Sequence, residues 1–170
     1  MSAAYRLLAA ACILALAACA AIPALSPSVT YVVVRHAEKA SDDARDPALS
    51  DAGRARADAL AALLHSRDVV ATYATGFRRT RDTAAPTAVK HDLSITAYDA
   101  DAPARTVATR LRRGHDHGTV LVVGHSNTVP GIVSALCECE VAPIDESDYG
   151  NLFEVRIREG RPPELLHERY

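Results

Sequence analysis

Hydrophobic residues along the chain gather in short apolar runs that alternate with amphipathic stretches. Runs rich in β-branched residues predict buried strands at 29–34, 69–74, 93–98 and 119–123. Helical spacing of apolar positions, together with start signals such as Ser50 and Pro130, predicts helices at 50–65, from about Arg79, 104–113 and 129–136. Strands that alternate with helices indicate a mostly parallel sheet.

The C-terminal part has a different pattern from the rest of the chain. Residues 149–157 alternate between apolar and polar types, which predicts an edge strand, and residues 164–170 follow two prolines as a possible last strand. The predicted fold class is therefore α/β: a three-layer α/β/α sandwich whose mostly parallel central sheet ends in one or more antiparallel edge strands.

The first 28 residues do not fit this pattern. Residues 1–18 combine a short positively charged start with an apolar run too short to span a bilayer, which is typical of a signal peptide. The run ends in Leu16-Ala17-Ala18-Cys19, which resembles a bacterial lipobox and predicts cleavage before Cys19 and a lipid on that cysteine. The alternative is an ordinary secretory signal cut after a later small residue, near 20–24.

These signals divide the chain into a signal peptide (1–18), a lipidated tether (19–28) and one domain (29–170). We expect that domain on the periplasmic side of a bacterial membrane, anchored through Cys19, or else soluble in the periplasm or secreted. The net charge of −2 gives no electrostatic reason to bind nucleic acid. Cys137 and Cys139 are a weak zinc signal, and the sequence leaves open whether they pair.

Charged side chains follow three of the predicted strands. Arg35 and His36 come directly after the first strand, Arg79 follows the second, and His125 follows the fourth. Since the carboxyl ends of parallel strands lie on one side of a sheet, these groups can converge on one pocket. Arginine matches phosphate oxygens and histidine can act as a nucleophile, so the set suits a phosphoryl dianion. The sequence shows neither a GxxxxGK[ST] loop nor a metal-ligand spacing, so we expect no metal and no cofactor.

Four sequence motifs indicate a family for this pattern. VVVRHAEK, LSDAGRARADALAALL, TGFRRTRDTAAPTA and VLVVGHSNTVPGI, in this order, resemble the histidine phosphatase superfamily, the phosphoglycerate-mutase-like proteins. The resemblance implies that His36 becomes phosphohistidine, that Arg35 and Arg79 bind the phosphoryl oxygens, and that His125 donates to the phosphoryl group.

The resemblance assigns the remaining candidates less directly. Glu38 occupies the acidic position after the nucleophile and is expected to shape the pocket, and Asn127 borders His125. The family usually supplies an acid for the leaving oxygen from the middle of the chain or directly after the second histidine. Here Ser126 stands at that second place, so Asp99 and Asp101, at the end of the third strand, are the candidates.

The leading functional prediction is a metal-independent phosphatase that hydrolyses phosphomonoesters, or similar phosphoryl compounds, through a phosphohistidine on His36. Its partner is then a small phosphorylated substrate, and the oligomeric state has no signal in the sequence. A phosphohistidine phosphatase or a mutase is an alternative within the family. A non-catalytic binder of phosphorylated or sulfated envelope ligands is another, although a binder has no need of a nucleophile at His36.

Overall fold

A six-stranded sheet runs through the described part of the computed structural model, residues 27–170, with the strand order β3-β2-β4-β1-β5-β6. The first four strands are mutually parallel, β5 pairs antiparallel with β1, and β6 pairs antiparallel with β5. The predicted signal peptide and Cys19 lie outside the described residues. The strands are β1 (Ser28–Arg35), β2 (Val69–Thr75), β3 (Ile95–Tyr98), β4 (Gly118–Gly124), β5 (Asn151–Arg158) and β6 (Glu164–Arg169).

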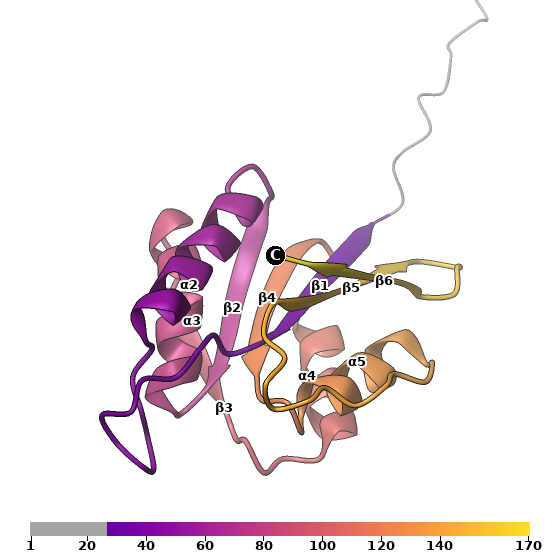
Figure 1. The fold of residues 1–170 in the computed structure, drawn as a ribbon. Helices are drawn as coiled ribbons and strands as arrows, with labels where there is room; N and C mark the ends of the chain where they lie inside the picture. The colour runs from indigo at the N-terminus through magenta and orange to yellow at the C-terminus, as the bar shows by residue number, and fades with distance from the viewer. Residues whose placement is uncertain (1–26) are drawn as a thin grey trace, which may run out of the picture.

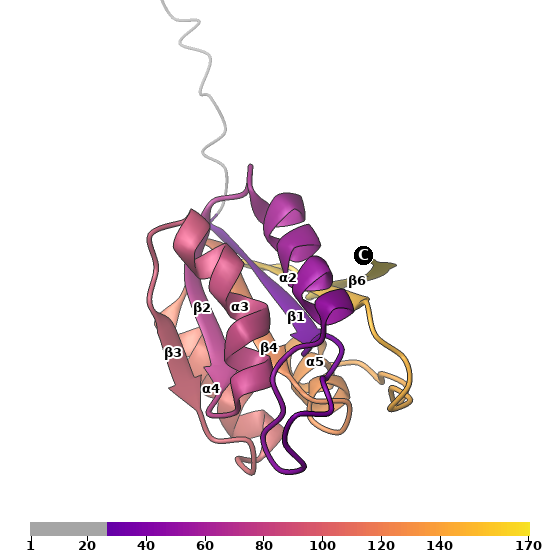
Figure 2. The same ribbon diagram turned by 60° about the vertical axis from the view of Figure 1, so that its left-hand side comes forward.

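Two helices cover each face of the sheet, which confirms the three-layer architecture (Figures 1 and 2). They are α2 (Asp51–Leu64) and α3 (Arg78–Lys90) on one face, and α4 (Ala104–Gly114) and α5 (Val129–Cys137) on the other. Strand β1 contributes to both layers of the core, because successive side chains of a strand point to opposite faces. Val32 and Val34 belong to the cluster that includes helix α2, whereas Tyr31 and Val33 belong to the cluster that includes α4 and α5.

Helix α2 is fastened to the segment that follows β1. Ser50 caps the helix by accepting a hydrogen bond from the Gly53 N–H at 3.1 Å, as the sequence predicts, and its own N–H donates to the Glu38 carbonyl at 2.9 Å. A Cβ atom on Gly53 would lie 2.3 Å from that carbonyl oxygen. Glycine is therefore needed at this position so that α2 can approach the backbone beside His36.

The antiparallel strands lie at one edge of the sheet, but their order corrects one prediction. Strand β5 was expected at the edge, whereas it lies between β1 and β6, and β6 is the outermost strand. Two polar residues of β5, Asn151 and Glu154, are buried, and each has a partner. Glu154 pairs with Arg67, and Asn151 bonds to Asp148 and His167. Because these buried residues are polar, the sequence pattern of β5 resembles that of an edge strand.

Two further features concern residues 27–170. Cys137 and Cys139 form a disulfide at the end of α5, which answers the question that the sequence leaves open. Within this part of the chain no helix combines the length and the apolar content that a membrane span requires.

Candidate active site

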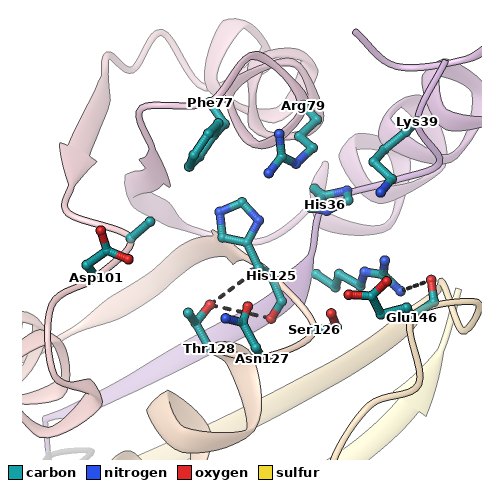
Figure 3. A pocket seen from close by; sticks show the side chains of 12 residues that line it. His36, Lys39, Phe77, Arg79, Asp101, His125, Ser126, Asn127, Thr128 and Glu146 are labelled. Atoms are coloured by element: carbon teal, nitrogen blue, oxygen red, sulfur yellow. Dashed lines mark hydrogen bonds between the residues drawn. The ribbon is translucent and has the colours of Figure 1, made fainter. Parts of the chain in front are cut away.

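The carboxyl ends of three adjacent strands, β2, β4 and β1, form one wall of a cavity of about 350 Å³ (Figure 3). Arg35, His36, Arg79 and His125 all line this cavity. The rings of the two histidines meet edge to face with their centroids 5.4 Å apart. The structure thus brings together the four residues that the strand ends single out.

His36 is held with one ring nitrogen available to the cavity. The side chain is 4% exposed, and Nδ1 lies 2.8 Å from the Ala37 carbonyl oxygen, which can only accept. The proton is therefore on Nδ1, and Nε2 presents a lone pair. Burial, together with the positive charge of Arg35, lowers the pKa of His36 to about 3. The imidazole is neutral at ordinary pH, as a nucleophile must be.

His125 lies opposite, at the end of β4. Its backbone N–H donates to the Thr128 hydroxyl at 3.0 Å, and its Nε2 is 3.0 Å from the hydroxyl oxygen of Thr75. The side chain is buried, and this burial, with the charges of Arg79 and Arg35, lowers the pKa of His125 to about 4.

Arg35 is bound on one side by a distant loop. Its Nη1 donates to the carbonyls of Asp145, Glu146 and Asp148 at 3.1, 2.7 and 3.2 Å, and its guanidinium carbon lies 4.2 Å from the centroid of the Tyr149 ring. Its Nε is buried and has no hydrogen-bond partner among the described residues. Arg35 therefore both holds the loop before β5 and keeps a donor unsatisfied beside His36.

Arg79 is still less compensated. Its Nε and Nη1 are buried without a hydrogen-bond partner among residues 27–170, and its nearest carboxylate oxygen, on Asp46, is 3.7 Å from Nη1. The guanidinium carbon lies 4.3 Å from the centroid of the Phe77 ring. Burial lowers the pKa of Arg79. Buried polar groups normally have partners, so the unsatisfied donors of Arg79 and Arg35 indicate a site completed by an external anion.

The two candidate acids occupy different places. Asp101 lines the cavity, and in Figure 3 it lies on the side of Phe77, away from Lys39. Asp99 does not line it. One oxygen of its carboxylate accepts from the Asp101 N–H at 3.0 Å, and the residue borders the neighbouring hollow, which shares Phe77 and Asp101 with the cavity.

The part of Glu38 in shaping the cavity stays a prediction, because its carboxylate does not line the cavity. The carboxylate forms a two-pronged ion pair with Arg56 of α2, with N–O distances from 2.6 to 3.0 Å, and this pairing lowers the pKa of Glu38. Asn127 does line the cavity, as does Ser126. Outside it, Arg78 is exposed and pairs with Asp42.

Three charged or aromatic residues of the lining received no role from the sequence: Lys39, Phe77 and Glu146. Lys39 and Phe77 stand within the quoted motifs, so their nearness to His36 and Arg79 could have suggested a place in the pocket. Glu146 has no such local signal, since the contact with Arg35 brings its loop there across 111 positions. Among residues 27–170, no group of three or more His, Cys, Asp or Glu side chains is arranged to hold a metal ion.

The family model of the histidine phosphatase superfamily (branch 1) matches residues 31–101, which include His36 and Arg79. Over these residues the chain is similar to the histidine phosphatase superfamily. The match confirms the resemblance that the sequence predicts, and it agrees with the predicted class of enzyme, a phosphoric monoester hydrolase. No curated protein sequence matches the chain.

Solved structures of histidine phosphatases share this fold over nearly their whole length. The protein histidine phosphatase SixA complexed with tungstate superposes with a TM-score of 0.69 at 20% identity, covering 82% of this chain and 96% of that one. A putative phosphohistidine phosphatase SixA from Nakamurella multipartitia gives 0.64 at 21% identity, covering 86% and 98%. A mycobacterial glucosyl-3-phosphoglycerate phosphatase gives 0.64 at 16% identity, covering 84% and 98%. At these identities the likeness establishes the fold.

Proposed function

We propose that the protein is a metal-independent phosphatase that hydrolyses phosphomonoesters, or similar phosphoryl compounds, through a phosphohistidine on His36. Two features of one cavity carry this proposal. His36 is neutral and has its lone pair on Nε2, and Arg79 and Arg35 have buried donors without hydrogen-bond partners among the described residues. A nucleophile beside uncompensated positive charge suits attack on a phosphoryl dianion.

In the first step, Nε2 of His36 attacks phosphorus in line with the leaving oxygen, and the bond from phosphorus to that oxygen breaks. Charge spread over the three equatorial oxygens meets the guanidinium groups, each fixed donor contributing about a hundred- to thousandfold in rate. Asp101, which borders both the cavity and the next hollow, is the proposed proton donor to the leaving oxygen. Water then attacks the phosphohistidine and returns the electron pair to Nε2.

The first experiment is hydrolysis of p-nitrophenyl phosphate with EDTA present, with His36→Ala as the matched variant. We expect turnover that survives the chelator and disappears in His36→Ala. An unaltered protein that binds phosphate tightly without turning over any aryl phosphate would instead be a binder. A mutase would transfer phosphate to an acceptor sugar acid faster than to water, so products limited to alcohol and inorganic phosphate would exclude it.

The substrate class can be tested through Asp101. Alkyl phosphates need protonation of the leaving oxygen, whereas aryl phosphates and phosphohistidine have better leaving groups. Asp101→Asn should therefore reduce turnover of an alkyl phosphate about a hundredfold and that of p-nitrophenyl phosphate less than about threefold. Asp99→Asn serves as the control. An unaltered enzyme that is inactive on alkyl esters would support a specialised phosphohistidine phosphatase, the activity for which the SixA proteins are named.

We also propose that the enzyme is an exported lipoprotein, anchored in the membrane through a lipid on Cys19. The support is the apolar run that ends in Leu16-Ala17-Ala18-Cys19. Cys19→Ser should release the protein from the membrane fraction of the producing cells into the soluble fraction. Retention of this variant in the membrane would contradict the anchor.

A further inference from the structure

A buried pair of hydroxyl groups adjoins His125 and has no part in the mechanism described so far. Thr75 ends β2 and Thr80 lies in the first turns of α3, and both residues are fully buried. The Thr75 oxygen is 3.0 Å from His125 Nε2 and 2.8 Å from the Thr80 oxygen. Beyond it, the Thr80 oxygen is 2.8 Å from the Phe77 carbonyl and 3.1 Å from the Thr75 carbonyl.

The direction of these hydrogen bonds follows from counting protons. A carbonyl oxygen can only accept, and each hydroxyl has one proton to donate. If Thr80 donates to a carbonyl, its oxygen accepts from the Thr75 hydroxyl. The Thr75 oxygen, having used its proton, then accepts from His125 Nε2–H. The reverse order would leave the Thr80 lone pairs facing two carbonyl oxygens with no proton between them, so the first order is favoured.

The same count determines what His125 offers to the cavity. With the proton on Nε2, the neutral ring has its lone pair on Nδ1. This atom is not among the buried side-chain atoms that lack a partner, and the ring lines the cavity (Figure 3). His36 has the opposite arrangement, since its proton is on Nδ1. The two facing histidines are thus held in opposite tautomers.

We propose that Thr75 and Thr80 are positioning residues that hold His125 in the Nε2–H tautomer, so that Nδ1 meets the phosphoryl group first as a proton acceptor. This inference rests on the proposed function and adds to it how the second histidine works. It changes the role expected from the sequence, in which His125 donates to the phosphoryl group, because donation then requires that Nδ1 first take up a proton.

The second chemical step supplies that proton. As the water oxygen forms its bond to phosphorus, one water proton passes to Nδ1 of His125. At the same time the bond between phosphorus and Nε2 of His36 breaks, and its electron pair returns to His36. The imidazolium of His125 still donates its Nε2–H to Thr75, so no hydrogen bond of the threonine pair has to reverse. Nδ1 then passes this proton through solvent to Asp101, the proposed donor to the leaving oxygen, so that both groups return to their starting states and the cycle balances.

The charges around His125 favour a neutral ring in the free enzyme. Cations outnumber carboxylates in the lining, so an added proton on the ring is unfavourable in the free enzyme. The titratable and charged groups that face it are His36 and Arg35 from β1 and its end, Lys39 from the next loop, Arg79 from α3, Asp101 from the loop after β3 and Glu146 from the loop before β5.

Nitrogen-15 NMR of the histidine rings in the free protein at neutral pH tests the proposal directly, because the two tautomers give different patterns. His125→Gln assigns the signal. We expect His125 as the Nε2–H tautomer in the unaltered protein, a mixture in Thr75→Val, and an unaltered pattern in Thr75→Ser. Thr87→Val is the matched control, since Thr87 is a buried threonine of α3 whose hydroxyl has no partner among the described residues.

Turnover of p-nitrophenyl phosphate provides the second measurement. Thr75→Val should lower kcat about ten- to a hundredfold with KM within about threefold, whereas Thr75→Ser and Thr87→Val should stay within about threefold of the unaltered enzyme. A His125 that is Nδ1–H in the unaltered protein, or a Thr75→Val variant with an unchanged tautomer and kcat, would overturn the proposal. Equal losses in Thr75→Val and Thr87→Val would do the same.

The design separates this inference from the proposed function. The tautomer is read without turnover, so an unaltered protein that has the expected tautomer but hydrolyses nothing would refute the phosphatase proposal alone. An active enzyme with the other tautomer would refute only the role of the threonines. If Thr75→Val does not fold, the spectrum of the unaltered protein and the Thr80→Val variant still decide the question.

Discussion

Two pairs of partly or fully buried arginines in this molecule have opposite surroundings. On the side of α2, Arg56 and Arg67 each meet a carboxylate in a two-pronged ion pair, with Glu38 and Glu154 respectively, and these hydrogen bonds raise the pKa of both arginines. In the cavity, Arg79 has no carboxylate within hydrogen-bond distance among the described residues, and burial lowers its pKa.

The difference separates arginines that the fold pairs with a carboxylate from arginines that line the cavity without a carboxylate at hydrogen-bond distance among the described residues. A buried charge without a partner costs free energy, and a fold offsets that cost when it supplies the counter-charge itself. It does so for Arg56 and Arg67. Arg79 and Arg35 instead line the cavity beside His36, and in the proposed function a phosphoryl group supplies their counter-charge.

The strongest test of this contrast is Arg79→Gln. Loss of a fixed guanidinium should reduce kcat/KM for p-nitrophenyl phosphate about a hundred- to thousandfold, while the melting temperature stays the same or rises because a buried charge with only a distant carboxylate partner is removed. Arg78→Gln, which alters the exposed neighbour on the same helix, should stay within about twofold. An Arg79→Gln variant that melts several degrees lower and retains activity would reverse the assignment.

A second prediction concerns the two histidines, which are buried beside the cationic arginines of the cavity. Their pKa values, about 3 for His36 and about 4 for His125, lie below the unfolded value of 6.5. The unfolded chain therefore binds more protons at acid pH, so stability is complete above about pH 6.5 and falls as pH drops toward 4. Each imidazole should cost about 2 kcal/mol at pH 5, measured by urea unfolding. His36→Gln should flatten this dependence, and an unchanged slope would contradict it.

Removing the carboxylate partner of a paired arginine should lower stability and leave activity unchanged, which is the opposite of the effect expected for Arg79→Gln. Glu154 is 4% exposed, and Glu154→Gln leaves Arg67 without its carboxylate, which should lower the free energy of unfolding by about 2 kcal/mol, given that Arg67 is partly exposed. The activity of the folded fraction should not change. The double variant Glu154→Gln/Arg67→Gln should recover part of the stability, and a loss of kcat in either variant would count against a purely structural pair.

The smallest predicted effect is stabilisation by inorganic phosphate. At ten times the dissociation constant, phosphate should add about 1.4 kcal/mol to the free energy of unfolding, seen as a rise in melting temperature. Arg79→Gln should abolish this rise and Arg67→Gln should retain it. Equal responses of the two variants would show that the anion binds elsewhere.

Much of the fold and of the cavity could be predicted because the buried strands of a parallel sheet are nearly continuous apolar runs in the sequence. Strand β1 is buried on both faces, so it appears as an unbroken apolar run, and its charged end at Arg35 and His36 stands out. The same logic predicts that Arg79 and His125 lie shortly after the ends of β2 and β4, and Arg79 lies in the first turn of α3. Which of these groups share a cavity then follows from the side-by-side order of the three strands.

The remaining features depend on contacts that no local pattern records. Glu38 follows the nucleophile but turns to Arg56, a residue 18 positions later on α2. Only Asp101 lines the cavity, because a turn holds the Asp99 carboxylate against the backbone N–H of Asp101. The interior place of β5 depends on the pairing of Glu154, whose charge, taken alone, indicates a solvent-exposed strand.

The hairpin turn between β5 and β6 lies at the opposite end of the sheet from the cavity, because Arg158 of β5 pairs with Ser28 at the start of β1. Gly160 in this turn has open space around it, with no atom within 4 Å of the place where a side chain would begin. A peptide inserted at this turn, or a chemical link to a solid support, would therefore hold the enzyme by its far end. Every immobilised molecule would present its cavity to the surrounding solution, so substrate access would be preserved on a sensor or a column.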